Sequence, residues 1–341
     1  MTKEPPFCPS AFIIAEAGVN HNGKEELALR LIDAAQEAGA DAVKFQLFDP
    51  DELGGTAPLA DYQEQNQGAW RDQREMLASL TLPREAYRRL AAHARARRIG
   101  MIVTPFDIAS AEFLISLGLK TLKIPSGEIT NHPFLKEVAA LGADVILSTG
   151  MCSLEEVQEA VGIFRSAGVP LTLLHCTSAY PAPYDHVHLR AMAFLRETFG
   201  LPVGLSDHTE GIEVAIAAAA LGACVIEKHI TLDRALSGPD HRASIEPEEL
   251  ARMIRSIRNV EAALGSAEKV RQVSEQNVAA VARRSVVAAY DLKKGQALTK
   301  EMIAIRRPGT GIPPKSLAEV IGKIAAQDIP SGTPLTWDML I

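Results

Sequence analysis

The sequence lacks the segments that would place a protein in or across a membrane. A membrane span needs a run of about 18 apolar residues, and none occurs. The apolar stretch from Ala215 to Ala220 is too short. Residues 1–10 lack the apolar core of a signal peptide. Only four cysteines occur, none of them in a CxxC pair: Cys8, Cys152, Cys176 and Cys224. We therefore expect a cytoplasmic protein whose cysteines are all free thiols.

Signatures of nucleotide and nucleic-acid binding are missing too. No GxxxxGK[ST] phosphate loop occurs, and no GxGxxG motif follows the first predicted strand. The formal net charge of −7 argues against nucleic acid, and the one basic stretch, Arg84 to Arg98, is typical of a solvated helix face. With 47% hydrophobic and 5% aromatic residues, the chain is typical of a globular protein with a sizeable core.

What the sequence does contain is a short apolar run ending in polar side chains, repeated eight times. The polar ends are Glu16; Lys44 and Gln46; Thr104; Lys123, Ser126 and Glu128; Ser148 and Thr149; His175 to Ser178; Ser206 to His208; and Glu227 to His229. A helix-like stretch follows each run, and several stop at glycine, as Glu25 to Ala38 does at Gly39. The pattern predicts a (β/α)₈ TIM barrel with a catalytic mouth.

The pattern changes towards the C-terminus. We expect the barrel domain to span residues 1–265 and to end with the helix Pro247 to Leu264. Residues 266–284 are polar and charged, which predicts a linker or a connecting helix. Residues 285–341 hold short strand-like segments, and a β-rich unit of about 57 residues is marginal alone, so we expect it to pack on the barrel or on a partner chain.

Two histidines are candidates for a metal site. His208 and His229 end adjacent predicted strands, and two imidazoles facing an open cavity suit a divalent transition ion, with water and substrate completing its shell. The alternative is that each is a hydrogen-bonded core histidine. Asp207 and Glu227 are candidate hydrogen-bond partners of these ligands.

The remaining polar ends indicate an anionic substrate. Two lysines and several hydroxyls suit a phosphate or carboxylate, although each lysine could instead pair with a neighbouring carboxylate. Of Glu16 and Glu128, one could bind substrate hydroxyls and the other could transfer protons; the alternative for each is an ion pair with lysine. The turn Gly238-Pro239 places Asp240 and His241 in a loop over the mouth.

Nine motifs along the chain, taken together and in their order, resemble those of the sialic acid synthase family. They are IIAEAGVNHNG, VKFQ, TPFD, KIPSGEITN, STGM, LHCTSAYPAP, GLSDHT, IEKHITLD and SGPDHRASIEP. The C-terminal unit, with its RPGTGI loop from Arg307 to Ile312, resembles the antifreeze-like (SAF) domain of that family, a β-clip fold.

The resemblance implies that phosphoenolpyruvate condenses with an open-chain N-acyl hexosamine, with Mn²⁺ or Mg²⁺ at His208 and His229, and that phosphate leaves by C–O cleavage. The residues implied to hold phosphoenolpyruvate are Lys44, Thr104, Lys123, Ser126, Ser148, Ser206 and Ser178, the last standing where an asparagine is usual. Those implied to contact the sugar are Glu16, Gln46, Tyr180 and Asp240. Glu128 would be the acid/base or water-orienting group, and Arg307 would reach the N-acyl group from the second chain of a domain-swapped homodimer.

The acceptor sugar decides between several functions. The first expectation is N-acetylneuraminate synthase acting on N-acetylmannosamine. The alternative is N,N′-diacetyllegionaminate or pseudaminate synthase acting on a 2,4-diacetamido-2,4,6-trideoxyhexose, since SGEITN and RPGTGI also occur in members that use legionaminic acid precursors. More remote are a barrel synthase for an unacylated sugar phosphate and a non-catalytic carbohydrate- or ice-binding protein, which would leave the polar strand ends unexplained.

Overall fold

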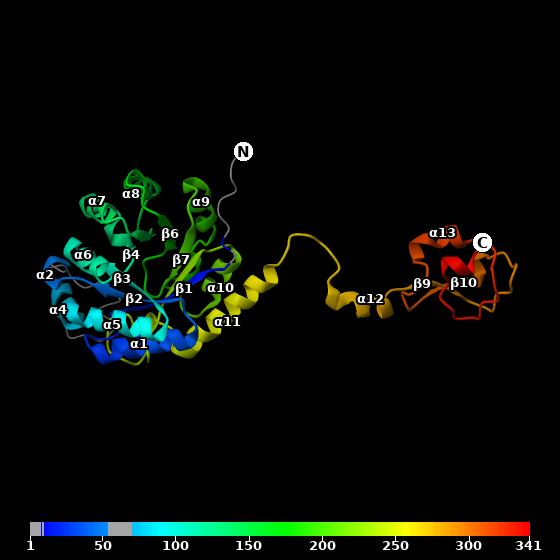
Figure 1. Ribbon diagram of the computed structural model, residues 1–341, viewed down its shortest axis with the longest axis horizontal. Coiled ribbons are helices and arrows are strands. Elements are labelled where there is room, and N and C mark those ends of the chain that lie inside the picture. Colours follow the sequence, from blue (N-terminus) through cyan, green and yellow to red (C-terminus); the bar gives the residue numbers. More distant parts are fainter. Residues whose placement is uncertain (1–7, 9, 54–69) are drawn as a thin grey trace. The chain divides into compact units, whose positions relative to one another are not determined.

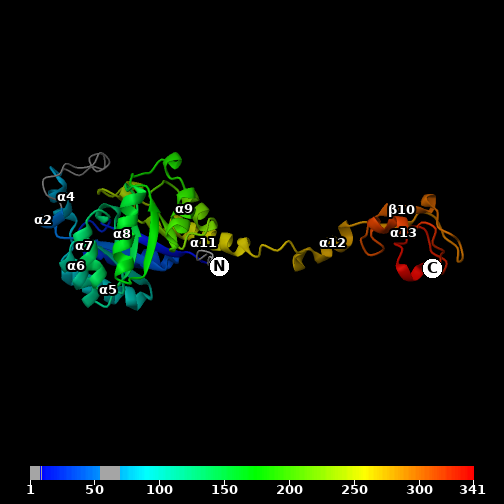
Figure 2. The ribbon, with the colours of Figure 1, turned by 90° about the horizontal axis from the view of Figure 1, so that it is seen from above.

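The chain divides into two compact units, Met1–Gly265 and Ser266–Ile341, each of which is described by itself. The structure is a computed structural model that describes residues 8, 10–53 and 70–341. In the first unit, eight parallel strands form a closed barrel, and helices surround it (Figures 1 and 2). The predicted TIM barrel is confirmed.

Each strand corresponds to one of the apolar runs. The strands are β1 (Phe12–Gly18), β2 (Ala42–Leu47), β3 (Gly100–Pro105), β4 (Thr121–Ile124), β5 (Asp144–Ser148), β6 (Leu171–Cys176), β7 (Val203–Asp207) and β8 (Val225–His229). Strand β1 pairs with β2 on one side and with β8 on the other, which closes the ring. All eight C-terminal ends therefore meet at one mouth.

One main helix follows each strand. They are α1 (Glu25–Ala38), α5 (Arg84–Arg97), α6 (Ile108–Ser116), α7 (His132–Ala140), α8 (Leu154–Ser166), α9 (Arg190–Phe199), α10 (Glu213–Ala220) and α11 (Pro247–Leu264). Two further helices, α2 (Pro50–Leu53) and α4 (Gln73–Leu80), lie between β2 and α5. Gly39 ends α1 in the left-handed conformation, with φ of 90°, which only glycine adopts without strain.

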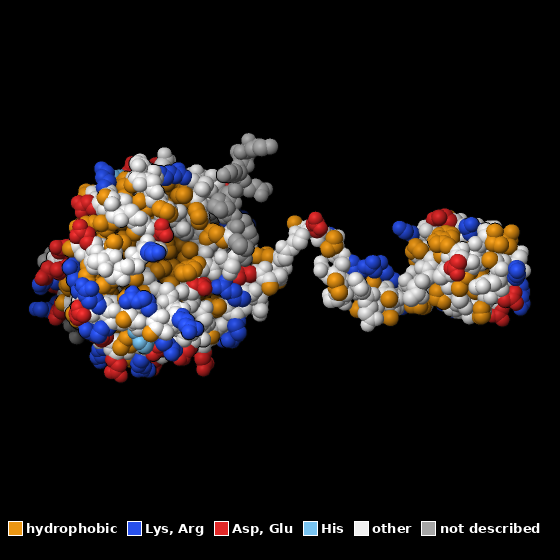
Figure 3. Space-filling model, in the orientation of Figure 1, with side chains coloured by type: hydrophobic (Ala, Val, Ile, Leu, Met, Phe, Trp, Pro, Cys, Tyr) orange, Lys and Arg blue, Asp and Glu red, His pale blue; other side chains and the backbone are white. Residues whose placement is uncertain are grey.

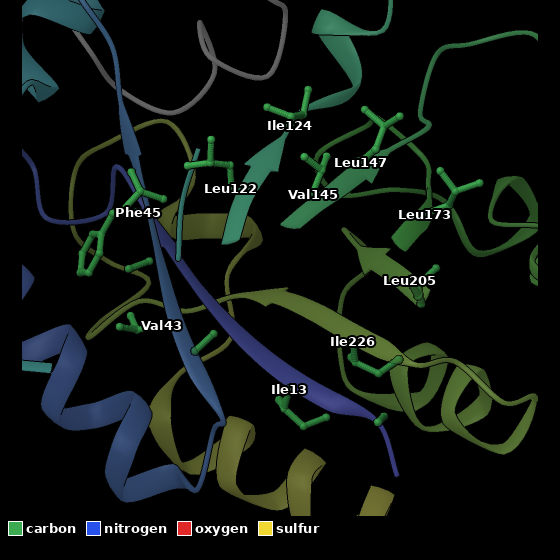
Figure 4. Close-up of a cluster of buried hydrophobic side chains, with 14 of the residues drawn as sticks. Ile13, Val43, Phe45, Leu122, Ile124, Val145, Leu147, Leu173, Leu205 and Ile226 are labelled. Atoms are coloured by element: carbon green, nitrogen blue, oxygen red, sulfur yellow. The ribbon is translucent and has the colours of Figure 1, made fainter. Parts of the chain in front are cut away.

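Side chains alternate between the two faces of each strand. Ile13, Val43 and Ile226 belong to the core between strands and helices, and Figure 4 shows this layer around the barrel. Ile14 and Ala42 belong instead to a smaller apolar layer inside the barrel. Because the period is two, the residues of the inner set nearer the strand ends also face the interior, and these are the polar ones.

The arginine-rich helix α5 is paired with acidic neighbours. Arg89 Nε lies 2.5 Å from Glu25 Oε1, and Arg97 Nε lies 2.9 Å from Asp33 Oδ1. In Figure 3, Lys and Arg side chains alternate with Asp and Glu over the part of the barrel where α1 and α5 lie. These contacts agree with a solvated helix face. Among the described residues, no helix has the length and apolar character that a membrane crossing needs.

The expectation that all four cysteines are free is wrong. Cys8 and Cys224 form a disulfide, with their Cα atoms 5.1 Å apart, while Cys152 and Cys176 are free. Closure of the barrel is the reason, because it pairs Phe12 with Val225 and so brings the segment before β1 next to the residue before β8. The two cysteines lie 216 positions apart, and their spacing gives no sign of this contact.

The second unit has a small core of its own. It contains α12 (Gln276–Ala282), α13 (Leu317–Val320) and an antiparallel pair of strands, β9 (Ser285–Ala288) and β10 (Ile303–Arg306). Val286, Leu298 and Leu335 are buried in its core. The short strands expected near residues 324–326 and 334–336 form only isolated bridges.

Candidate active site

A cavity of about 460 Å³ opens among the C-terminal strand ends and holds most of the residues expected there. Those that line it are Glu16, Lys44, Gln46, Thr104, Lys123, Ser126, Ser148, Ser178, Tyr180, Ser206, His208, His229 and Asp240. A larger hollow of about 730 Å³ lies at the other end of the strands, but its lining is mostly apolar. The chemistry therefore belongs to the smaller cavity.

Two lysines and two carboxylates form a buried network in this cavity. Lys44 Nζ lies 2.9 Å from Glu16 Oε1 and 3.5 Å from Glu227 Oε2. Lys123 Nζ lies 3.6 Å from Glu227 Oε1, which also accepts a hydrogen bond of 2.8 Å from Ser206 Oγ. Both lysines are thus ion-paired, as one alternative expected, and both still line the cavity. The network comes from β1, β2, β4, β7 and β8.

The carboxyl groups differ in their affinity for a proton. Burial, reinforced by Glu227, raises the pKa of Glu16 despite the Lys44 ammonium. Burial acts in the same direction on Glu227, but Lys123 and Lys44 outweigh it and hold the pKa of Glu227 at about 2. Burial, followed by the charge of Glu16, raises the pKa of Asp240 to about 6. Glu227 is therefore a permanent anion, whereas Asp240 can carry a proton close to neutral pH.

Hydroxyl groups surround the lysines. Lys44 Nζ donates to Thr104 Oγ1 at 3.1 Å, and Ser126 Oγ accepts from the Gly150 amide at 2.8 Å. Within the described residues, the buried Ser148 Oγ has no hydrogen-bond partner, so it is available to a ligand. A Cβ on Gly150 would lie 3.1 Å from Ser126 Oγ, so glycine keeps this side of the cavity open.

His208 and His229 come together, as their strands require. Their ring centroids are 5.4 Å apart, and the Tyr180 ring lies 4.2 Å from that of His208. His208 Nδ1 donates to the Thr177 carbonyl oxygen at 2.9 Å, so in the neutral ring the lone pair is on Nε2, which lies 3.4 Å from Ser206 Oγ. Burial, then His208 and Lys44, lowers the pKa of His229 well below its ordinary value, so that its imidazole is neutral.

These histidines fit a divalent ion with few protein ligands. The buried Nδ1 of His229 has no hydrogen-bond partner and lies 4.0 Å from Asp240 Oδ2. The described part of the chain holds no group of three or more His, Cys, Asp or Glu arranged as a metal site. An ion held by the two imidazoles would therefore take its other ligands from water or substrate.

The two carboxylates considered as histidine partners have other roles. Asp207 Oδ2 lies 2.8 Å from Lys228 Nζ, and both side chains are 1% exposed. Strand alternation directs this pair away from the cavity, so Asp207 is not a partner of the histidines. Glu227 lies on the same face as His229, as expected, but its hydrogen bonds and ion pairs go to Ser206, Lys44 and Lys123.

Two expected site residues are not in the cavity lining. Glu128 belongs to a 3₁₀ turn, Ser126–Glu128, where its Oε2 accepts a hydrogen bond of 2.7 Å from Asn131 Nδ2. Arg307 lies in the second unit and its side chain is exposed. Of the strand residues that line the cavity, two had no assigned part in substrate binding or catalysis, namely Glu227 and Cys176. Their strand positions, on the inner set of β8 and β6, were the signal for them.

Comparisons with known proteins agree with this geometry. The NeuB family model matches residues 31–269, and the SAF domain model matches residues 283–341. The chain is 48% identical to the N,N′-diacetyllegionaminic acid synthase of Legionella pneumophila, over 96% of this chain and 94% of that protein. It is 47% identical to the protein of the same name from Campylobacter jejuni, over 93% and 96%.

A solved structure is similar over most of the chain. The N-acetylneuraminic acid synthetase of Leptospira borgpetersenii, in complex with citrate, superposes with a TM-score of 0.70 and 36% identity, over 79% of this chain and 90% of that chain. The family model covers well over half of the residues. The chain therefore belongs to the NeuB family, the sialic acid synthase family that its motifs resemble, and is an enzyme of that family with a C-terminal SAF domain.

Proposed function

We propose that this enzyme is an N,N′-diacetyllegionaminate synthase, which condenses phosphoenolpyruvate with 2,4-diacetamido-2,4,6-trideoxymannose. The observation that carries the proposal is the identity of 47–48%, over nearly the whole chain, to two proteins of that name. N-acetylneuraminate, the first expectation, has weaker support from these relatives than the legionaminate alternative.

One side of the cavity supports a less polar acceptor. Val19, Met76 and Leu80 are buried in one apolar cluster and also line the cavity. The proposed acceptor carries a methyl group at C6 and an acetamido group at C4, where N-acetylmannosamine carries hydroxyls. An apolar wall accepts the methyl groups and leaves buried hydroxyls without partners, which favours the trideoxy sugar.

The polar side suits the donor. Phosphoenolpyruvate carries a phosphate and a carboxylate, and Lys44 and Lys123 supply two buried ammonium groups for them. Ser126, Ser148 and Ser206 add hydroxyl groups on the same side. Ser178 also lines the cavity and can donate a hydrogen bond in place of the usual asparagine.

The reaction forms one carbon–carbon bond. Carbon 3 of phosphoenolpyruvate attacks the aldehyde carbon of the open-chain sugar, and water adds to carbon 2. Phosphate then leaves with cleavage of its bond to carbon 2, which gives a 2-keto acid. The aldehyde oxygen gains a proton, and Asp240 would donate it, because it lines the cavity and burial raises its pKa to about 6, whereas Glu128 is outside the cavity lining.

A divalent ion, Mn²⁺ or Mg²⁺, would be held by His208 and His229 and would polarise the aldehyde. The hydrogen bond from His208 to Thr177 fixes the imidazole tautomer that a metal ligand needs. Glu16, Gln46 and Tyr180 would contact sugar hydroxyls at the mouth.

We also propose a homodimer in which Arg307 of one chain completes the site of the other. The exposed guanidinium of Arg307 and the exposed valines before and within α12, such as Val273 and Val278, leave surfaces for a second chain. We place the enzyme in the cytoplasm because phosphoenolpyruvate is made there, although a disulfide such as Cys8–Cys224 is rare in that compartment.

Competition between acceptors tests the proposal. The enzyme is incubated with phosphoenolpyruvate, Mn²⁺ and equal amounts of N-acetylmannosamine, 2,4-diacetamido-2,4,6-trideoxymannose and its altrose isomer, and the products are identified by mass spectrometry and released phosphate. The legionaminate product is expected to dominate. A dominant neuraminate or pseudaminate product would replace the assigned sugar, and no product from any of them would refute the synthase. His208→Ala is the inactive control.

A further inference from the structure

Asp240 lies in a loop that has little regular secondary structure. It follows β8 and precedes a single 3₁₀ turn, His241–Ala243. Its side chain is 11% exposed and lines the cavity, and its Oδ2 lies 4.0 Å from His229 Nδ1. In a connection with so little regular structure, side-chain contacts must set the position of the carboxylate.

His241, the residue after Asp240, is hydrogen-bonded to Asn22 in the turn after β1. His241 is fully buried, and its Nε2 lies 3.0 Å from Asn22 Oδ1, an oxygen that can only accept, so Nε2 carries the proton. Its Nδ1 lies 2.7 Å from Thr231 Oγ1. Burial lowers the pKa of His241 to about 4, so the ring is neutral.

Asn22 holds the loop on the other side of Asp240 as well. Its Nδ2 donates to the Ser237 carbonyl oxygen at 2.9 Å, so one side-chain amide binds the chain before and after residues 238–240. A Cβ on Gly238 would lie 2.6 Å from His241 Cδ2 and 2.9 Å from Asn22 Oδ1. The loop therefore packs on Asn22 with no room for a side chain at residue 238.

Asn20, which lies with Asn22 in the turn after β1, is linked to the backbone of Asp240. Ser244 Oγ donates to the Asp240 carbonyl oxygen at 2.6 Å, and Asn20 Nδ2 donates to Ser244 Oγ at 2.9 Å. Asn20 Nδ2 also donates to the Ile230 carbonyl oxygen at 2.9 Å. Asn20 and Ser244 are each 1% exposed, so these contacts are shielded from water.

We propose that Asn20 and Asn22 are positioning residues that fix the Asp240 carboxylate for the acceptor sugar, acting through Ser244 and His241. Neither asparagine lines the cavity, so neither can act on the substrates directly. The inference rests on the proposed function, in which Asp240 contacts the acceptor. The turn after β1 thereby serves the loop after β8.

Kinetic measurements with each of the two substrates distinguish a positioning role from a general effect on stability. The residues assigned to phosphoenolpyruvate lie in strands β2 to β7 or directly after them, and the asparagine contacts described above do not include them. Loss of the asparagine contacts should therefore lower kcat/KM for the sugar and leave KM for phosphoenolpyruvate unchanged. A merely destabilised barrel would raise KM for both substrates.

The test compares Asn22→Ala and Asn20→Ala with Asn259→Ala, which removes an exposed asparagine from α11. For the first two, kcat/KM for the sugar is expected to fall about 10- to 100-fold, while KM for phosphoenolpyruvate changes less than about twofold. Asn259→Ala should match the wild type. All rates are measured below the onset of unfolding of each variant.

Two histidine variants provide rescue and its control. Glutamine places an amide nitrogen near the position of Nε2 and can still donate to Asn22, whereas asparagine is too short. His241→Gln is therefore expected to keep most of the activity towards the sugar, and His241→Asn to lose it. Equal losses in both would contradict the contact with Asn22.

A double variant and an experiment without substrate complete the test. In an Asp240→Ala background, Asn22→Ala should cause no further loss, because it acts only through Asp240. In the absence of substrate, hydrogen exchange of residues 233–244 should be faster in Asn22→Ala. Additive losses, unchanged exchange, or equal rises in KM for both substrates would each overturn the proposal. Should wild-type enzyme convert no sugar, the proposed function fails, and the exchange result alone decides whether the asparagines hold the loop.

Discussion

Asp207 in β7 and Lys228 in β8 form an ion pair, with 2.8 Å between Oδ2 and Nζ. Lys228 Nζ also donates to the Thr209 carbonyl oxygen. Each residue is the immediate chain neighbour of a histidine, His208 or His229. The pair therefore ties β7 to β8 at the level where the histidines face the cavity.

Removing one member of this pair should destabilise the barrel. Asp207→Asn leaves the Lys228 ammonium buried without its counter-ion, which is expected to lower the free energy of unfolding by about 3–5 kcal/mol. Urea unfolding followed by circular dichroism measures the change. The double variant Asp207→Leu with Lys228→Met should recover most of it, because no buried charge remains. A loss in Asp207→Asn no larger than in an exposed control such as Asp338→Asn would count against this account.

Glu227 is expected to set the charge of the donor site. It lies 3.6 Å from Lys123 Nζ, and burial lowers the pKa of Lys123 although the charge of Glu227 opposes this shift. In Glu227→Gln a larger fraction of Lys123 is neutral, so kcat/KM for phosphoenolpyruvate should fall about tenfold or more. The loss should shrink at pH 6 and grow at pH 9, since acid restores the ammonium. Glu227→Asp keeps the charge and should be milder; equal pH profiles for Gln and wild type would exclude this role.

Metal removal should abolish turnover without unfolding the protein. Mn²⁺ titration by calorimetry is expected to show binding to wild-type enzyme and none to His208→Ala or His229→Ala. Their kcat should fall at least about 100-fold, because positioning and polarisation of the aldehyde are both lost. Unchanged melting temperatures would confirm that the fold survives. Full activity after treatment with EDTA would contradict the metal site.

Two buried histidines predict a loss of stability in acid. Burial lowers the pKa of His21 and of His241 to about 4, below the value near 6.5 of the unfolded chain. The unfolded chain therefore binds more protons between these values, so stability is full above pH 6.5 and falls towards pH 4. The loss should reach at most about 3 kcal/mol for each histidine. In His21→Gln the pH dependence of the urea midpoint should flatten; an unchanged slope would show that other groups cause it.

The disulfide predicts an effect on stability and none on catalysis. Cys8 and Cys224 lie at the end of the barrel opposite to the mouth, as their place before β1 and β8 requires. Cys8→Ser, or reduction, should lower the free energy of unfolding by about 2–5 kcal/mol. At temperatures where both forms are folded, kcat should match that of the wild type. A change in kcat with unchanged stability would contradict this separation.

The sequence was sufficient for the barrel because each strand has a local signature. Val145 to Leu147 reads as a buried parallel strand on its own, and the next polar residue, Ser148, marks its C-terminal end. The period of two also placed Lys44 and Gln46 on one face, and both line the cavity. The acceptor sugar could not be predicted from the sequence, because no motif indicates that apolar side chains of α4 line the cavity.

Contacts between side chains of different strands could not be predicted from the spacing of residues in the sequence. Glu227 was expected beside the histidines but lies between two lysines, because the stagger of neighbouring strands decides which interior side chains meet. Glu128 was expected in the mouth, yet a 3₁₀ turn turns it towards Asn131, and strand alternation does not apply there. Cys8 and Cys224 meet only because the ring closes.

The disulfide has one more consequence, which concerns how cleavage of the chain is observed. Together with the backbone, it makes a covalent ring of everything between Cys8 and Cys224, including every connection of the barrel up to that residue. A protease that cuts once inside this ring leaves two fragments joined, so a gel without reductant shows a chain of full mass. A cut in residues 266–284 lies outside the ring and releases the SAF domain under either condition. Paired gels with and without reductant therefore report which part of the molecule opens first.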